Sequence, residues 1–237
     1  MSKILEVENL HKEFTLHILN DKKIRALDSV SFEMEEGEII GLTGKSGSGK
    51  STLMKCIHRT YLPSAGRMLM HTGANGAVDL ATANEHQVLK VRKTEMTYCS
   101  QFLQAIPRVP AVEVVSEGLL RKGCSRDEAF RIARDCFARL GLPEELWDAY
   151  PATFSGGEQQ RINISRAIIS KPRFLLVDEP TASLDLKTKD AVIDMMLELK
   201  DQGTSTILIT HDEHSLTRMA DRCLHMENGA VRQSAQM

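Results

Sequence analysis

The chain has 237 residues, of which 30 are Lys or Arg and 32 are Asp or Glu, so its net charge is −2. This length predicts a single domain with a subdomain, and the balanced charge excludes an extended basic surface for nucleic acid. No apolar stretch approaches the roughly 20 residues that cross a bilayer, so we expect neither a membrane span nor a signal peptide. Five scattered cysteines without a CxxC pair indicate reduced thiols and therefore the cytosol.

The first 80 residues alternate apolar stretches with turns. Ile4–Leu10, Ile24–Met34 and Glu38–Leu42 have the length and composition of strands. A glycine-rich loop follows the third of them, and Leu53–Thr60 after the loop predicts a helix. Arg67–Leu80 contains the glycines and asparagine of a turn and therefore predicts a hairpin.

The middle of the chain, residues 105–170, predicts a helical insertion. Val112–Leu120 and Glu158–Ile169 carry helical patterns, and Ser125–Glu128 has the sequence of a capping box. Apolar residues recur at helical spacing after that box until Gly141, where the helix is expected to end.

The last third of the chain returns to alternating strands and helices. Phe174–Val177 and Ser205–Thr210 predict strands, and Lys187–Lys200 between them predicts a helix. Strand, helix and strand in this order imply a parallel sheet and an α/β fold. Asn228–Gly229 predicts the turn of a closing hairpin.

The glycine-rich loop is the strongest functional signal. It consists of Gly44, Lys45, Ser46, Gly47, Ser48, Gly49, Lys50, Ser51 and Thr52. Its glycines let successive backbone N–H groups point at one phosphate, while Lys50 can reach the β- and γ-phosphates and Ser51 can ligate Mg²⁺. A glycine-rich turn with an incidental lysine is the alternative, which the flanking strand and helix disfavour. The loop predicts that the chain binds a nucleoside triphosphate with magnesium.

Two adjacent carboxylates follow the apolar strand Phe174–Val177. Ligands of open α/β sheets lie at this end of the strands. Asp178 is therefore a candidate Mg²⁺ ligand, and Glu179 is the candidate general base for the attacking water. Taken alone, the pair is equally compatible with a charged turn.

A second candidate anion site begins at the signature segment, Phe154–Arg161. Ser155, Gly156, Gly157 and Glu158 open a predicted helix there, and a helix N-terminus attracts anions. The chain thus has two predicted phosphate sites and one predicted base.

These segments together resemble the ATP-binding cassette (ABC) superfamily, and the resemblance covers nearly the whole chain. It implies an ABC-type P-loop NTPase, with a parallel-sheet core and an antiparallel β subdomain over 1–104 and 171–237, and a helical signature subdomain over 105–170. It also implies a head-to-tail dimer, in which Ser155 and Gly157 of one subunit close over the γ-phosphate held by the other. The signature departs from the commonest family pattern at Phe154 and at Glu158, whose carboxylate we expect to slow closure or to demand tighter neutralisation by Mg²⁺.

Four further positions match the family in order. The resemblance implies that Gln101 contacts Mg²⁺ and the attacking water, that Asp185 meets the partner's phosphate loop, that His211 contacts the γ-phosphate, and that Phe14 stacks on adenine. Three of these residues also have a plain alternative: a surface or capping glutamine for Gln101, a structural histidine for His211 and a core phenylalanine for Phe14. A metal site that combines His211 with His214 lacks a third ligand in the sequence.

A finer resemblance concerns the residues between these motifs. Residues 100–109, 146–147 and 151–161 are similar to the L-subunit family of the bacterial phosphonate carbon–phosphorus lyase system, as are His17–Asn20 and Tyr61–Gly66. That family implies a cassette that works with the lyase core and a sister cassette, and it is associated with the synthesis of α-D-ribose 1-methylphosphonate 5-triphosphate. Since the sequence shows no nucleophile for displacing adenine, the chain's own predicted chemistry is ATP hydrolysis.

The main alternative is the motor subunit of an ABC membrane transporter. Such a motor would grip its permease at the helical insertion and at the loop Phe102–Val109, where the two hypotheses differ. A DNA-repair cassette is disfavoured by the neutral charge and by the lack of a coiled coil. The sequence leaves open whether the functional pair is a homodimer or includes a sister cassette.

Overall fold

The computed structural model describes residues 2–16, 18, 21–73, 76–104 and 107–236. Parts of two segments that carry the finer resemblance, His17–Asn20 and residues 100–109, lie outside the described residues. The strands are β1 Lys3–Leu16, β2 Lys22–Glu35, β3 Ile39–Thr43, β4 Ala65–Thr72, β5 Gly76–Asp79, β6 Met96–Cys99, β7 Phe174–Asp178, β8 Ser205–Ile209, β9 Arg222–Glu227 and β10 Ala230–Gln236. The helices are α1 Lys50–Ile57, α2 Glu85–Thr94, α3 Ala111–Arg121, α4 Arg126–Arg139, α5 Gly156–Ile168, α6 Leu186–Asp201 and α7 Glu213–Met219.

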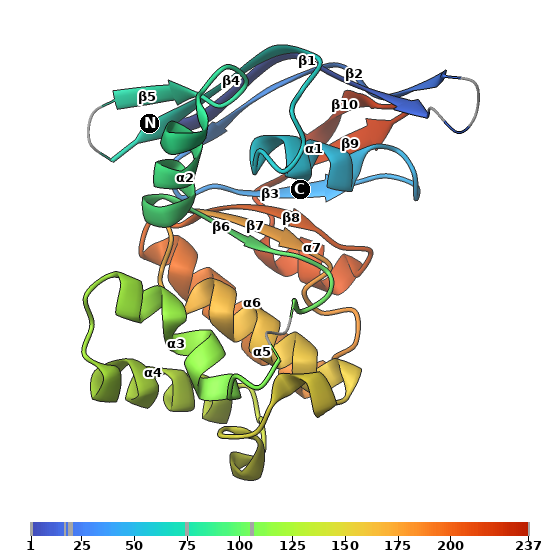
Figure 1. Cartoon of the computed structure of the whole chain (residues 1–237). Helices are drawn as coiled ribbons and strands as arrows, with labels where there is room; N and C mark the ends of the chain where they lie inside the picture. Colours follow the sequence, from blue (N-terminus) through green and yellow to red (C-terminus); the bar gives the residue numbers. More distant parts are fainter. Residues whose placement is uncertain (1, 17, 19–20, 74–75, 105–106, 237) are drawn as a thin grey trace.

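Two sheets organise these elements. The larger has the strand order β10-β9-β3-β8-β7-β6, and all its neighbours are parallel except the edge pair β10 and β9. The smaller sheet, β2-β1-β4-β5, is antiparallel throughout. In Figure 1 the small sheet forms the top layer, α1 lies between the two sheets, and α5 and α6 cover the other face of the large sheet. This arrangement confirms the predicted α/β fold class.

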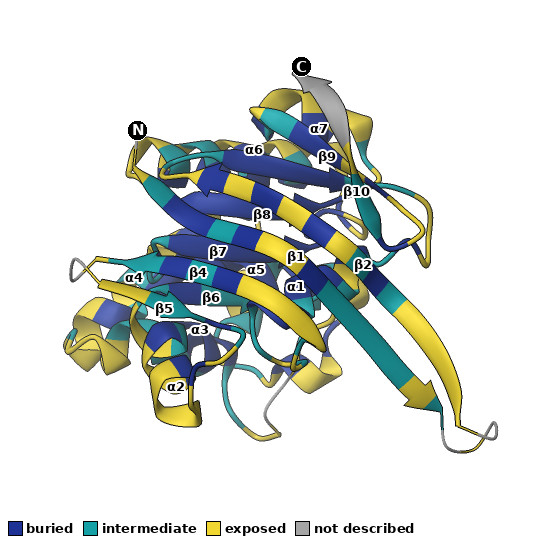
Figure 2. Ribbon diagram, turned by 90° about the horizontal axis from the view of Figure 1, so that it is seen from above, coloured by how far each residue is buried: buried dark blue, intermediate teal, exposed yellow. Residues whose placement is uncertain are grey.

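The central strands β7 and β8 are buried along their whole length because both faces of the sheet are covered (Figure 2). Successive side chains of a strand point to opposite faces. Phe174 and Leu176 accordingly join the apolar cluster that contains α1, while Leu175 and Val177 join the cluster with α5, α6 and α7. β7 therefore contributes side chains to the apolar clusters on both faces of the large sheet.

A third apolar cluster fills the helical part of the chain. Val115 from α3, Phe137 from α4 and Ile162 from α5 pack against one another, with Phe154 of the signature segment beside them. α3 and α4 lie away from both sheets, at the bottom of Figure 1. The signature segment is thus anchored in the helical layer, although the limits 105–170 proposed for that subdomain stay a prediction.

Several details of the sequence reading need correction. α1 begins at Lys50, three residues earlier than predicted, because the loop lysine is itself the first helical residue. The capping box predicted at Ser125–Glu128 forms only in part: the Ser125 hydroxyl accepts from the Glu128 backbone N–H at 3.3 Å, whereas the Glu128 carboxylate pairs with Arg131.

The hairpin turn at Asn228–Gly229 is confirmed, and both residues have the positive φ of its preferred turn type.

Two composition-based expectations can be set beside the structure. No helix in the described ranges has the length and apolarity needed to span a membrane. All five cysteines are free thiols, and four of them are buried.

The central position of β7 leads to a stability prediction. Leu176→Ala would remove a side chain that is 0% exposed, whereas Leu89→Ala on α2 would remove one that is 59% exposed. We expect the buried change to lower the free energy of unfolding by roughly 2–5 kcal/mol, because it leaves a cavity in the core. Urea denaturation would measure both variants, and equal losses would contradict this account of the core.

Candidate nucleotide-binding site

The phosphate loop joins β3 to α1 in a tight turn that requires glycine. Gly44, Gly47 and Gly49 all have positive φ, at 132°, 79° and 107°. A Cβ on Gly49 would lie 2.7 Å from the carbonyl oxygen of Ala26, so a side chain is excluded there sterically as well. The loop thereby brings its backbone close around the N-terminus of α1, which favours bound anions.

Lys50 is folded back over this loop. Its Nζ donates to the carbonyl oxygens of Gly44 at 2.6 Å and Lys45 at 3.0 Å. Burial lowers the pKa of Lys50, an effect that the nearby carboxylates of Glu179 and Asp178 oppose. The ammonium is therefore held at the loop, where a phosphate chain would lie against it.

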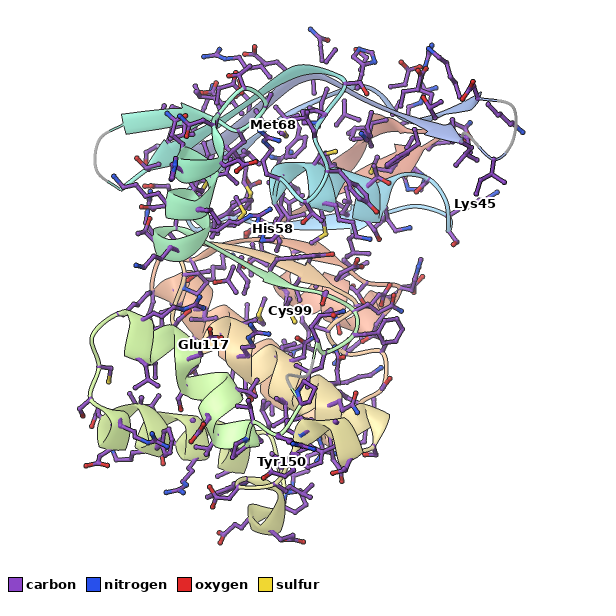
Figure 3. The ribbon with its side chains drawn as sticks, viewed as in Figure 1. Lys45, His58, Met68, Cys99, Glu117 and Tyr150 are labelled. Atoms are coloured by element: carbon purple, nitrogen blue, oxygen red, sulfur yellow. The ribbon has the colours of Figure 1, made fainter. Side chains whose placement is uncertain are left out.

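A cavity of about 800 Å³ opens at the carboxyl ends of β7 and β8, beside this loop. The predicted site residues that line it are Ser46, Gly47, Gly49, Lys50, Ser51, Thr52, Gln101, Asp178, Glu179 and His211. The structure thus brings the loop, both carboxylates, the glutamine and the histidine to one place. Lys45, at the outer edge of the loop (Figure 3), does not line this cavity.

Three of these residues offer oxygen atoms that suit Mg²⁺. The Ser51 hydroxyl, the Gln101 amide and the Asp178 carboxylate line the same cavity, and oxygen ligands are those that this cation prefers. Burial raises the pKa of Asp178, while a hydrogen bond with Ser51 opposes the rise. The residues therefore fit Mg²⁺, with substrate phosphates and water completing its shell.

The alternative metal site at His211 and His214 finds no support. Within the described ranges, no group of three or more His, Cys, Asp or Glu side chains could hold a metal ion. His214 instead lies with its Nε2 3.2 Å from Asp190 Oδ1, on the surface of α6.

Glu179 lies in a constrained position beside His211. Its φ of 52° is unusual for a residue with a side chain, and such backbone strain gathers at functional sites. The side chain of Gln160 donates to the carbonyl oxygen of Glu179 at 3.2 Å and so helps to hold that backbone. Glu179 Oε1 is 3.5 Å from His211 Nε2, and burial raises the pKa of the carboxyl group. This geometry suits a base that is aimed at a water molecule.

The sequence reading missed several residues of the cavity wall. Thr181 lies three positions after Asp178, and its buried hydroxyl has no hydrogen-bond partner among the described residues. Lys189 from α6 also lines the wall, with its Nζ 3.7 Å from Asp212 Oδ2. Thr181 could have been found from its closeness to the carboxylates, but no local sequence signal marks Lys189.

Phe14 lies outside the lining of this cavity. Its ring meets Tyr61 edge-on, with the ring centres 5.2 Å apart, and Lys12 Nζ lies 4.7 Å from the centre of the same ring. Ile24, its register partner on β2, does line the cavity. The contact of Phe14 with adenine therefore stays a prediction.

The signature segment also lies apart from this chain's nucleotide cavity. Ser155 and Glu158 form a complete capping box at α5: the Glu158 carboxylate accepts from the Ser155 N–H at 2.8 Å, and the Ser155 hydroxyl caps the Glu158 N–H. This capping lowers the pKa of Glu158. Gly156 faces open space, and Gly157 lies against the Ser183 carbonyl. A role in a partner's site is consistent with this exposure and stays a prediction, as does the expected slowing by Glu158.

Asp185 belongs to the same surface. It is the N-cap of α6 and accepts from the Thr188 N–H at 3.0 Å. Its Oδ2 lies 3.7 Å from a terminal nitrogen of Arg161, in the signature helix. Capping explains the conformation of Asp185, while its predicted contact with a partner is untested.

Comparisons with known proteins agree with this geometry. A family model described as ABC transporter matches residues 27–182. The lipoprotein-releasing system ATP-binding protein LolD of Shewanella sp. (strain MR-4) is 35% identical over 217 residues, which cover 91% of each chain. The L-cystine import ATP-binding protein TcyN of Bacillus subtilis is 31% identical over 96% of this chain and 84% of that protein. The dimeric, post-hydrolysis structure of an ATP-binding cassette bound to ADP and phosphate superposes with a TM-score of 0.88, at 26% identity, over 98% of both chains.

The position of Glu179 leads to a kinetic prediction. Glu179→Gln keeps the size of the side chain but cannot accept a proton, so we expect ATP to bind while turnover falls by roughly 10²–10⁴. Nucleotide titration and phosphate release would measure the two effects separately. Near-normal turnover in this variant would assign the base to another residue.

Proposed function

This chain belongs to the ABC transporter family, and from that premise we propose that it hydrolyses ATP as one of two cassettes that close over the nucleotide, a pair that we call the ATP-driven clamp. The observation that carries the proposal is the single cavity shared by Lys50, Ser51, Asp178, Glu179 and His211. A loop that holds phosphates and a base that faces the same space are what hydrolysis of a phosphoanhydride requires.

In the proposed reaction the loop backbone and Lys50 bind the phosphate chain of ATP. Glu179 takes a proton from the attacking water, and Gln101 and His211 keep that water in line with the γ-phosphate. Magnesium, held by Ser51 and Asp178, would neutralise charge on the phosphates.

A second cassette completes the proposed clamp. Ser155 and Gly157 at the exposed start of α5 would close over the nucleotide of the partner, and Asp185 would meet the partner's phosphate loop. The dimeric structural neighbour supports pairing of this kind. The partner is either a second copy of this chain or a sister cassette.

We favour a membrane transporter as the system that the clamp drives, with this chain as its cytoplasmic motor subunit. The names of the relatives describe lipoprotein release and L-cystine import, so transport supplies the strongest precedent. Phe102, directly after Gln101, is 71% exposed and lies on the segment between β6 and the helical layer. This segment is the surface on which we expect a membrane partner to be gripped.

A second candidate is the phosphonate carbon–phosphorus lyase system. Residues 146–147 and 151–161, with the described part of 100–109, favour it, because they resemble that system's L subunit both within and beyond the motifs common to all cassettes. In this case the chain would couple ATP-driven closure to the lyase core, and the synthesis of the ribose methylphosphonate triphosphate would belong to the whole assembly.

The clamp can be tested by mixing two inactive variants. Lys50→Ala should lose ATP binding, while Gly156→Glu, at a position that faces open space, should repel a partner's nucleotide. If sites are shared between two copies, mixed dimers contain one intact site, and the mixture should regain roughly a quarter of wild-type ATPase activity. A mixture as inactive as its components would argue against a homodimer with shared sites, and Gly156→Ala serves as the matched control.

The load can be identified by capture from the native cell. Tagged Glu179→Gln protein, purified with MgATP, should remain closed on its partners because turnover is blocked. Mass spectrometry that finds a polytopic membrane protein supports the transporter motor. Co-purification of soluble phosphonate-lyase subunits would instead replace it with the second candidate.

A further inference from the structure

Glu179, the proposed base, has a backbone conformation that its own sequence disfavours. Its φ of 52° is rare for a residue with a side chain. The next residue is Pro180, and a residue before proline is normally extended, with φ near about −120°. Local preferences therefore do not produce this conformation, and contacts from elsewhere in the fold must hold it.

Two hydrogen bonds hold the peptide planes on either side of Glu179. On its amino side, the Glu179 N–H donates to the carbonyl oxygen of Ile209 at 2.9 Å. On its carboxyl side, Gln160 Nε2 donates to the carbonyl oxygen of Glu179 at 3.2 Å. Since φ and ψ are the rotations between two rigid peptide planes, holding both planes fixes the direction in which the Glu179 side chain leaves the backbone.

The side-chain amide of Gln160 is committed to this segment. The same Nε2 donates to the carbonyl oxygen of Pro180 at 2.9 Å, so its two N–H bonds serve two carbonyl oxygens. Gln160 is 6% exposed, so water cannot readily replace it as the donor. Buried carbonyl groups commonly find a donor of this kind. Here, however, the two carbonyl groups belong to the proposed base and to the proline that follows it.

One oxygen of the Glu179 carboxylate is left for a ligand or a water molecule. Oε1 is buried and has no hydrogen-bond partner within the described ranges, while His211 Nε2 lies 3.5 Å away. Glu179 lines the nucleotide cavity. The place of this oxygen in the cavity is set by the backbone from which the side chain extends.

Gln160 lies on α5, and this helix contacts the segment after β7 at three residues. Gly157, in its first turn, packs so closely that a Cβ there would lie 3.1 Å from the carbonyl oxygen of Ser183. A terminal nitrogen of Arg161 is 3.7 Å from Asp185 Oδ2. Together with the hydrogen bonds of Gln160, these contacts hold residues 179–185 against the helix that begins at the signature segment.

We propose that Gln160 is a positioning residue for ATP hydrolysis, which aims Glu179 at the attacking water by fixing the peptide that follows the base. The proposal rests on the proposed function, in which Glu179 takes the proton. In that function the start of α5 meets the partner's nucleotide, so one helix serves the partner's site at its N-terminus and this chain's own site through Gln160. Misplacing a reacting group by about 1 Å can slow a reaction by roughly 10²-fold.

The first test removes the donor. Gln160→Met keeps the length of the side chain but cannot donate, and Gln160→Asn keeps the amide but withdraws it by one methylene. Both variants are measured as the whole protein, in the dimer in which it hydrolyses ATP. We expect kcat to fall roughly 10- to 100-fold. ATP affinity and KM should hardly change, because Gln160 does not line the nucleotide cavity.

The second test asks whether Gln160 acts through Glu179. If it does, Gln160→Met should lower kcat in the otherwise wild-type protein but hardly lower it further in the Glu179→Gln background, because the base that it aims is already lost. A residue that only stabilises the fold would lower kcat by the same factor in both backgrounds. If Gln160→Met does not fold, Gln160→Asn takes its place in this comparison.

Thr204→Val is the matched control. The Thr204 hydroxyl is also buried and also donates to a backbone carbonyl, that of Pro172 at 2.7 Å, but at the opposite edge of the large sheet. Its loss should lower the midpoint of thermal unfolding and leave kcat unchanged. The control thus separates the loss of a buried hydrogen bond from the loss of the aim of Glu179.

Two outcomes would overturn the role of Gln160 and leave the proposed function intact. One is wild-type kcat in the folded Gln160 variants, and the other is an equal loss of kcat in both backgrounds. Near-normal turnover of Glu179→Gln alone would instead overturn the proposed base, and the role of Gln160 with it.

Discussion

The site depends on the meeting of three buried parallel strands at one sheet edge. β8 lies between β3 and β7, and Ile209 is in register both with Leu42 on β3 and with Asp178 on β7. The segments that follow these three strands therefore begin next to one another at the same edge of the sheet. The phosphate loop follows β3, Glu179 follows β7 and His211 follows β8 shortly after its end, so the register of the strands brings together residues that are far apart in the sequence.

This edge also concentrates conformational strain. Glu179 has a positive φ directly after β7, whereas the positive φ of Gly44 and Gly49 in the phosphate loop is readily adopted because glycine has no Cβ. For Glu179 the conformation costs energy and persists only when the surrounding structure fixes it. Here β3 and β7 are anchored by cores on both faces of the sheet, while Gln160 holds the backbone of Glu179 from the helical layer. The core thus maintains the shape of a loop that local preferences alone would not give.

The sequence was a good guide wherever function depends on a contiguous segment. The loop from Gly44 to Thr52 and the pair Asp178 and Glu179 are each readable because neighbouring residues act together. Lys189 was not predicted, since it lies on α6 and joins the wall of the nucleotide cavity only through packing. The capping box predicted at Ser125 is only partly formed because Arg131 competes for the Glu128 carboxylate.

A cavity of about 680 Å³ adjoins the nucleotide cavity, and the residues Ser51, Gln101 and Asp178 that line both of them bear on how ATP could drive a load. An ATP-driven clamp moves a partner only through a difference in affinity between its states. Gln101 lines both cavities, and Asp178 does the same. If a partner that shifts either side chain changes nucleotide affinity, nucleotide must by linkage change the affinity for that partner by the same factor. A partner that contacts Gln101 or Asp178 from the neighbouring cavity would therefore be coupled to the nucleotide through residues that line both spaces.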